Sequence, residues 1–225
     1  MQTFFPEKSI LPNQFSFSSE FPLSQAVIMN TEDGAGRASG KIRCPWCEKD
    51  DLYRSYHDQE WGFPVHDDRK FFEKLILDGA QAGLSWYTIL SKRENYRKAF
   101  ADWDVHKVAR FTERKMEKLM LDSGIVRNRL KIRSAVQNAK VFILIQKEFG
   151  SFDSYVWSFV NHRQIINYPK IMKEIPVTSP ESDALSADLK KRGMSFVGST
   201  IIYAFLQAAG LVDDHLVSCW RKSQV

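Results

Sequence analysis

Apolar side chains recur every three to four residues from about Asp67 onward, and this spacing constrains the fold more than any other feature of the sequence. Phe71, Phe72 and Leu75 fall on one face of a helix, which we expect to be interrupted at Gly79. The short alternating patterns typical of strands do not dominate this region. The fold class predicted from the spacing is therefore all-α.

Capping residues, Pro and Gly signal where the individual helices begin and end. We expect helices to begin near Ser85, Asp104, Thr112, Leu130, Ser179 and Ser199 or Thr200. The first of these is predicted to run through Tyr96 as one helix. Three helices are predicted to stop before Gly150, Gly193 and Gly210.

Residues 1–40 differ in composition from residues 41–225. They are rich in Ser, Pro, Asn and Gly, and their Phe residues show no clear period. We predict a flexible N-terminal extension over 1–40 and one domain over 41–225, with Met29 as an alternative start. The extension lacks the basic start and compact apolar core of a secretory signal.

Composition narrows the class of protein. No apolar run approaches the roughly 20 residues of a membrane-spanning helix. Three cysteines in 225 residues do not suit a disulfide scaffold, so we expect a reducing, cytoplasmic compartment. The formal net charge of +5 is compatible with a polyanionic partner such as nucleic acid.

Cysteine and histidine residues near the two ends of the domain are candidate metal ligands. On a helix, His215 and Cys219 would stand at i and i+4 and face one tetrahedral ion. His57, with either Cys44 or Cys47, would complete a set of donors that suits zinc. A small buried helix end without metal is the alternative. The histidine motif of a zinc deaminase is absent, because His57 is followed by Asp and Gln rather than by x-Glu.

Aromatic residues surround the segment LDGAQAGLSW, which ends at Trp86. Tyr53, Tyr56, Trp61 and Trp86 would form a pocket for a planar, cationic base, with Asp78 as its acceptor. Core packing of the rings and a capping role for Asp78 are the alternatives.

The segment MLDSGIVRNRLKI reads as a helix-hairpin-helix. Gly124 permits a tight turn before Ile125, and the amides at the N-terminus of the next helix would be free to hold a phosphate, with Arg127 and Arg129 adding charge.

A series of segments joins these features: RCPWC, YHDQEWG, QAGLSW, ILSKRENYRKAF, SGIVRNRLKI, VWSFVNH, KKRGMSFVGST and GLVDDHLVSC. They run in order from Arg43 to Cys219. In them the chain resembles the bacterial 3-methyladenine DNA glycosylases of the constitutive type I, within the helix-hairpin-helix superfamily. The resemblance implies a two-lobed helical fold whose chain ends are joined by a structural zinc. It gives the zinc ligands as Cys44, His57, His215 and Cys219, with Cys47 outside the set.

The resemblance also implies an activity. It implies a monomeric enzyme that flips 3-methyladenine out of alkylated double-stranded DNA and hydrolyses its N-glycosidic bond. Tyr56 and Trp86 would stack on the base as catalytic residues beside Asp78, while Tyr53 and Trp61 complete the pocket. Loop residues Gln81, Gly83 and Leu84 would enter the gap in the duplex, and Gly124, Ile125 and Arg127 would bind the DNA backbone.

Asp78 departs from the resemblance, because the carboxylate at the matching position in the family is a glutamate. We predict that Asp78 still recognises the base. The start of the hairpin helix carries no lysine where lyase-type members have their nucleophile, although Lys131 is near, so we expect no lyase step. Asp153 is interpreted as a helix cap. A non-catalytic module that binds damaged DNA, and a zinc-containing interaction protein, are the competing hypotheses.

Overall fold

The computed structural model describes residues 40–222. The predicted extension up to residue 39, the alternative start at Met29 and the last three residues lie outside the described residues.

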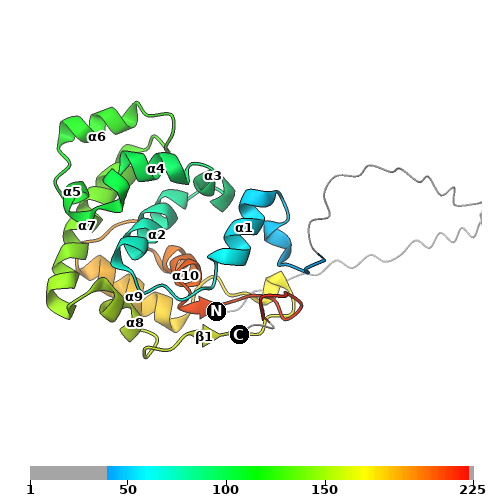
Figure 1. Ribbon diagram of the computed structural model, residues 1–225. Helices are drawn as coiled ribbons and strands as arrows, with labels where there is room; N and C mark the ends of the chain where they lie inside the picture. The colour runs from blue at the N-terminus through cyan, green and yellow to red at the C-terminus, as the bar shows by residue number, and fades with distance from the viewer. Residues whose placement is uncertain (1–39, 223–225) are drawn as a thin grey trace, which may run out of the picture. The chain divides into compact units, whose positions relative to one another are not determined.

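The described part is mostly helical, as predicted (Figure 1). Its α-helices are α1 Asp51–Gln59, α2 Asp68–Gln81, α3 Trp86–Leu90, α4 Arg93–Ala99, α5 Val105–Ala109, α6 Glu113–Met120, α7 Arg129–Phe149, α8 Phe152–Ser158, α9 Pro180–Lys191 and α10 Ser199–Ala208. Three 3-10 turns accompany them: η1 Pro45–Cys47, η2 Ala101–Trp103 and η3 Met172–Glu174. The strands β1 Ile165–Ile166 and β2 Val212–Asp213 form one short parallel pair, with Ile165 opposite Val212.

Most predicted boundaries are confirmed by side-chain caps. Asp104, Thr112 and Ser179 each accept a hydrogen bond from the backbone amide three residues ahead, which satisfies a free donor of the first helical turn. Helix α7 ends at Gly150, and α10 is followed by Gly210 with φ +68°. Gly210 also lies against backbone, because a Cβ there would stand 2.0 Å from the carbonyl carbon of Phe63.

Two helix predictions are wrong. Helix α2 continues through Gly79 to Gln81, because the position of a Cβ at Gly79 is 3.5 Å from Phe196 and the helix packs closely there. The helix predicted from Ser85 through Tyr96 is two helices, α3 and α4. The break between them lies at Ser91 and Lys92. There the Ser91 hydroxyl donates to the Thr88 carbonyl, and this local hydrogen bond competes with the backbone hydrogen bonds of a continuous helix.

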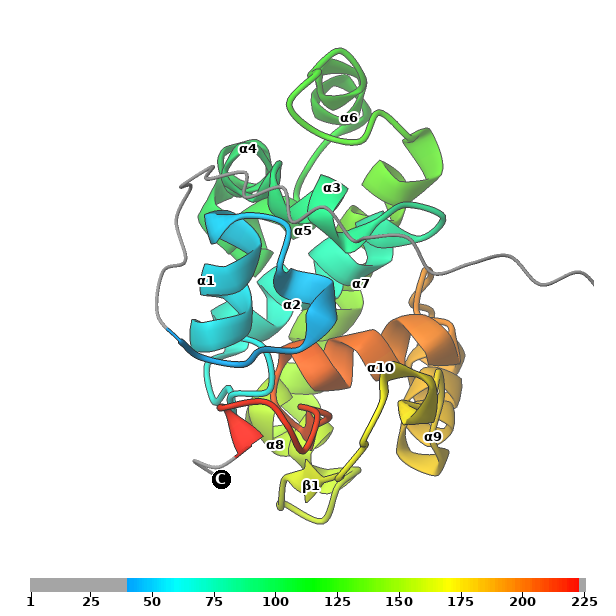
Figure 2. The same ribbon diagram turned by 90° about the vertical axis from the view of Figure 1, so that its right-hand side faces the viewer.

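Helix α2 is the centre of the core. Residues 71–80 are buried along its whole circumference, as expected for a helix surrounded by others. It packs against α10, α7, α3 and α8, and α1 lies beside it in both views (Figures 1 and 2). This central helix carries Asp78 near its C-terminal end, so the position of that carboxylate is fixed by the core.

Candidate active site and metal-ligand cluster

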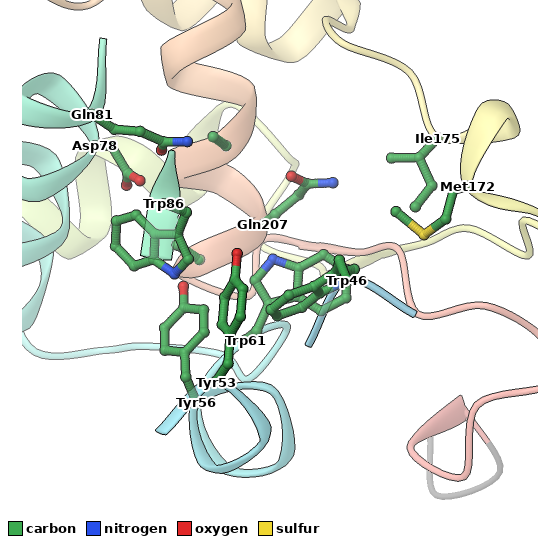
Figure 3. Close-up of a pocket in the computed structure, with 12 residues that line it drawn as sticks. Trp46, Tyr53, Tyr56, Trp61, Asp78, Gln81, Trp86, Met172, Ile175 and Gln207 are labelled. Carbon is green, nitrogen blue, oxygen red and sulfur yellow. The ribbon is translucent and has the colours of Figure 1, made fainter. Parts of the chain in front are cut away.

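A cavity opens where α1, α2, α3, α10 and the η3 segment meet, and we refer to it as the slot (Figure 3). The residues that line it are Trp46, Tyr53, Tyr56, Trp61, Asp78, Gln81, Trp86, Met172, Ile175, Ala204, Gln207 and Ala208. The structure thus brings together the predicted aromatic residues, Asp78 and Gln81, although they are spread over more than thirty positions of the sequence.

The aromatic residues form two neighbouring groups in the slot. The rings of Tyr56 and Trp86 lie 5.3 Å apart between centroids, and Trp46 contacts Tyr53 at 5.0 Å and Trp61 at 5.1 Å. Tyr56 and Trp61 are buried, while Tyr53 and Trp86 are half-buried at the slot. The rings therefore pack on one another, as the alternative of core packing expects. They also present surface to the slot, as the predicted pocket requires.

Local hydrogen bonds hold these rings in place. Asp50 caps α1 by accepting from the Tyr53 amide at 2.9 Å and also accepts from the Tyr87 hydroxyl, which joins α1 to α3. Ser85 caps α3 by accepting from the Thr88 amide at 3.2 Å, so that Trp86 takes the first helical position. The two helices that supply the stacking rings are thus fixed to each other.

Asp78 is the acidic residue among those that line the slot, and it is only 3% exposed. Its Oδ2 has no hydrogen-bond partner among the described residues, and neither has the Nε1 of Trp86. Burial raises the pKa of Asp78 to about 7, and the charge of Lys74 acts in the opposite direction. The capping role for Asp78 is wrong, since it lies inside α2 rather than at an end. A buried acceptor and a buried donor without partners are groups that a ligand in the slot would satisfy.

The loop after α2 is exposed beside the slot. Gly83 adopts φ +75° and Leu84 is 41% exposed, so the loop presents an apolar side chain to solvent. Lys131 donates from Nζ to the carbonyls of Ala80 at 2.8 Å and Ala82 at 2.6 Å. Its amine therefore holds the end of α2, and Lys131 does not line the slot.

The segment that was predicted to form the hairpin joins α6 to α7. Ile125 is buried and Arg127 is exposed. At the start of α7, where free amides are expected, the Lys131 amide donates to Asn128 Oδ1 at 3.1 Å, so this amide is not free. The Gly124 amide donates to Asp122 Oδ1 at 2.8 Å, and the Val126 amide donates to the Tyr96 hydroxyl at 3.1 Å. These partners stabilise the turn.

The two ends of the domain meet at a cluster of buried donor groups. Ligand atoms of Cys44, His57 and Cys219 all lie within 4.8 Å of one another. The hydrogen bond with Cys44 is the main reason that the pKa of Cys219 is lowered to about 4. Cys47 is also buried, but its Sγ is directed to the Cys44 carbonyl at 3.2 Å and it does not belong to the group.

The i, i+4 helical arrangement predicted for His215 and Cys219 is wrong. Asp213 Oδ1 accepts from the His215 amide at 2.9 Å, and the Cys219 amide bonds to the Leu216 carbonyl at 2.8 Å, so the segment forms turns. The His215 ring nevertheless lies next to that of His57, with centroids 4.9 Å apart. Its Nδ1 is bonded to Asp213 at 2.8 Å, while its buried Nε2 has no partner among the described residues.

Comparisons with known proteins show the family to which this chain belongs. The methyladenine glycosylase family matches residues 46–222 of the chain. The chain belongs to the methyladenine glycosylase family. It is 49% identical to DNA-3-methyladenine glycosylase 1 of Escherichia coli, over 79% of this chain and 95% of that protein. It is 47% identical to DNA-3-methyladenine glycosylase of Haemophilus influenzae, over 80% of this chain and 98% of that protein.

Solved structures of this family have the same fold. A crystal structure of 3-methyladenine DNA glycosylase I has a TM-score of 0.78 and 46% identity, and the match covers 80% of this chain and 98% of that one. The enzyme from Staphylococcus aureus, described in connection with 3-methyladenine recognition, also gives 0.78, with 37% identity and cover of 80% and 96%. Membership of this family makes the chain a glycosylase of the constitutive type I.

Sequence reasoning missed part of the slot in this methyladenine glycosylase. Trp46 lies within the segment RCPWC, and the sequence analysis gives it no role. Gln207 reaches the slot from α10, with its Nε2 bound to Asp214 at 2.7 Å, and Met172 and Ile175 come from η3 and the residue after it. These residues are far along the chain from the predicted slot residues, and no sequence pattern indicates that they join the site.

Asp153 does not lie in the slot, and its interpretation as a cap is wrong. The cap of α8 is Ser151, and Asp153 in the first turn contacts the His66 ring at 3.0 Å. No described helix is long and apolar enough to cross a membrane.

Proposed function

We propose that this chain releases 3-methyladenine from alkylated double-stranded DNA by hydrolysing the N-glycosidic bond. The observation that carries the proposal is Asp78, a buried carboxylate whose Oδ2 has no hydrogen-bond partner among the described residues, in a slot walled by aromatic rings. Methylation gives the base a positive charge while it is attached to the sugar. A carboxylate and electron-rich rings are the groups that attract such a planar cation.

The charge of the base also explains why few catalytic groups are needed. A cationic base leaves with the bonding electron pair as a neutral molecule, so no residue has to protonate it. Water then adds to the sugar carbon, loses a proton and leaves an abasic site. Asp78, Tyr56 and Trp86 bind the base and hold it out of the stack, with Tyr53 and Trp61 completing the walls. The protein works mainly by binding and electrostatic stabilisation.

Base flipping follows from the position of the slot beside an exposed loop. A base in a duplex must leave the stack to enter a slot of this kind. Gln81, Gly83 and Leu84 stand at the slot or in the exposed loop next to it, and the Leu84 side chain is apolar enough to fill the gap in the duplex. Gly124, Ile125 and Arg127 form the hairpin that binds the DNA backbone, chiefly through the exposed Arg127 side chain.

A lyase step is not part of the proposal. The amine of Lys131 donates to two carbonyls and lies outside the slot, so it does not reach the sugar as a nucleophile. The chain acts as a monofunctional enzyme, and borohydride trapping of a covalent adduct with DNA would contradict this. We place its action in the cytoplasm, as a monomer on double-stranded DNA.

A structural zinc ion fits the cluster at the domain ends. Cys44, His57 and Cys219 supply three donor atoms within reach of one ion, and the unpartnered Nε2 of His215 is the fourth. Carboxylates orient both histidines, because Asp58 contacts His57 Nδ1 and Asp213 contacts His215 Nδ1, each at 2.8 Å. Four protein donors leave no open position, so zinc would stabilise the fold and take no part in the reaction.

Base release from methylated double-stranded DNA tests the proposal. We expect free 3-methyladenine and abasic DNA in amounts that increase with enzyme. Salt-dependent binding of alkylated DNA without base release would instead indicate the non-catalytic damage-binding module. If the chain neither binds the DNA nor releases base, the result would favour the hypothesis of a zinc-containing interaction protein.

A further inference from the structure

A group of buried and half-buried charged residues includes Asp78 of the slot, and we call it the charge cluster. It consists of Glu60 at the end of α1, Glu73, Lys74 and Asp78 on α2, and Arg93 at the start of α4. Arg93 bridges the two glutamates, with Nε 2.7 Å from Glu73 and Nη1 2.6 Å from Glu60. The Nζ of Lys74 lies 3.9 Å from the second carboxylate oxygen of Glu60.

The charge cluster contains one carboxylate more than it has cations. Arg93 and Lys74 together balance Glu60 and Glu73, with which they form ion pairs. The remaining carboxylate is Asp78, whose Oδ2 has no partner among the described residues. The excess negative charge therefore lies on the one member of the cluster that lines the slot.

Lys74 is the cation placed to act on Asp78. The two residues are one helical turn apart on α2, at i and i+4, and both are buried, with exposures of 6% and 3%. The Nζ of Lys74 also lies 5.9 Å from the ring centroid of Tyr56, which is a wall of the slot. Charges this deeply buried are screened little by salt or water, so the charge of Lys74 acts on Asp78 and opposes the effect of burial.

We propose that Lys74 is a positioning residue that keeps Asp78 ionised in the empty slot, so that the carboxylate meets the incoming cationic base as an anion. This inference rests on the proposed function of the slot. A protonated Asp78 would offer a neutral group and lose its attraction for the charged base.

The electrostatics of the neighbouring groups support this role. Burial raises the pKa of Asp78 to about 7, and Lys74 opposes the rise. Burial lowers the pKa of Lys74, while Glu60 and Asp78 raise it. Removing the ammonium would leave two excess negative charges in the charge cluster, and Asp78 would take up a proton at a higher pH.

Arg93, Glu60 and Glu73 also act on the pKa of Lys74, and Tyr56 is a further titratable group on which Asp78 acts. The pKa of Tyr56 lies well above its usual value, first because of burial and second because of Asp78, so the phenol is neutral across the working range. Lys70 acts on Glu60 from the surface of the same helix. Lys70 therefore offers a matched control, since its removal takes away the same charge one turn further from Asp78.

The experiment is the dependence of kcat/KM for 3-methyladenine release on pH, from 6 to 9. In the wild type we expect an acidic limb near the pKa of free Asp78. Lys74→Met should raise that limb by about one pH unit, which lowers kcat/KM roughly eightfold at pH 6.5 and hardly at pH 9. Lys74→Arg should restore the wild-type profile, and Lys70→Met should leave it unchanged.

Three results would overturn the inference. The first is an acidic limb of kcat/KM that does not shift in Lys74→Met. The second is a loss of kcat/KM in Lys74→Met that is equal at every pH. The third is a shift of the limb in Lys74→Arg that is as large as in Lys74→Met. If circular dichroism shows that Lys74→Met does not fold, Lys74→Gln takes its place with the same expectation. A wild type that releases no base refutes the proposed function instead.

Discussion

Replacing Asp78 by Asn should make the protein more stable at neutral and alkaline pH while removing its activity. Asp78 is buried, its Oδ2 has no hydrogen-bond partner within residues 40–222, and burial raises its pKa from 3.8 to about 7. Because the folded protein binds the proton more tightly than the unfolded chain does, folding is favoured in acid. The free energy of unfolding decreases as the pH rises from about 4 to 7.

The size of this effect follows from the two pKa values. One pKa unit corresponds to about 1.4 kcal/mol, so full ionisation of Asp78 costs about 4 kcal/mol. Between pH 5 and pH 8 the cost increases by about 2 to 3 kcal/mol. Asn keeps the shape and cannot ionise, so the variant avoids the increase. The free energy of unfolding of Asp78→Asn relative to wild type should therefore rise by that amount over the same interval.

Urea unfolding at pH 5, 6.5 and 8, with equal zinc in all samples, measures the difference. Glu117→Gln, which changes an exposed carboxylate on α6, is the control and should show no such trend. A stability difference between Asp78→Asn and wild type that stays constant with pH would refute the reasoning. It would mean that Asp78 is not an ionised buried group at pH 8.

Three further predictions follow from the same contacts. In the wild type, kcat/KM should fall below about pH 7 as Asp78 takes up a proton, whereas kcat should hold to lower pH because the bound cation keeps the carboxylate ionised; initial rates at low and saturating DNA separate the two. Gly210→Ala should lower stability by 3 kcal/mol or more or prevent folding, since the new Cβ would overlap the Phe63 backbone at φ +68°, and urea unfolding will show it. Cys219→Ala should lose bound zinc, measured by mass spectrometry of the metal, and lower the melting temperature, while Cys47→Ala should keep both.

The helices could be predicted because their signals are local. Caps at Asp104, Thr112 and Ser179 and the glycines after α7 and α10 act within one turn, so the sequence alone contains the information. Gly79 shows the limit of such rules. A glycine inside a helix weakens it, but packing of α2 at the centre of the core overrides that preference.

The candidate site was predictable where its residues are close in sequence or match the family segments. The aromatic residues around QAGLSW and the carboxylate at Asp78 fall in this class. Gln207 and Met172 reach the slot only through the packing of α10 and η3, which no local pattern encodes. The arrangement of His215 and Cys219 was predicted wrongly for a similar reason, because Asp213 competes for the backbone that a helix would have used.

The charge cluster could not be predicted from the sequence, for a different reason. Lys74, Glu73 and Arg93 look like the solvated charges of amphipathic helices when read as letters. The burial of Lys74 and Glu73 and the ion pairs of Arg93 depend on how α1, α2 and α4 meet. Only the structure shows that Arg93 and Lys74 form ion pairs with Glu60 and Glu73, while Asp78 forms no ion pair among the described residues.

The most direct test is single-turnover release of base from a duplex that contains one 3-methyladenine, measured for wild type and Asp78→Asn. Asp153→Asn is the matched control, because Asp153 lies outside the slot. We predict that wild type and Asp153→Asn release the base at similar rates, while a folded Asp78→Asn is at least a hundredfold slower, in line with the loss of one strong electrostatic contact at a reaction centre. Release by Asp78→Asn at the wild-type rate would contradict the account.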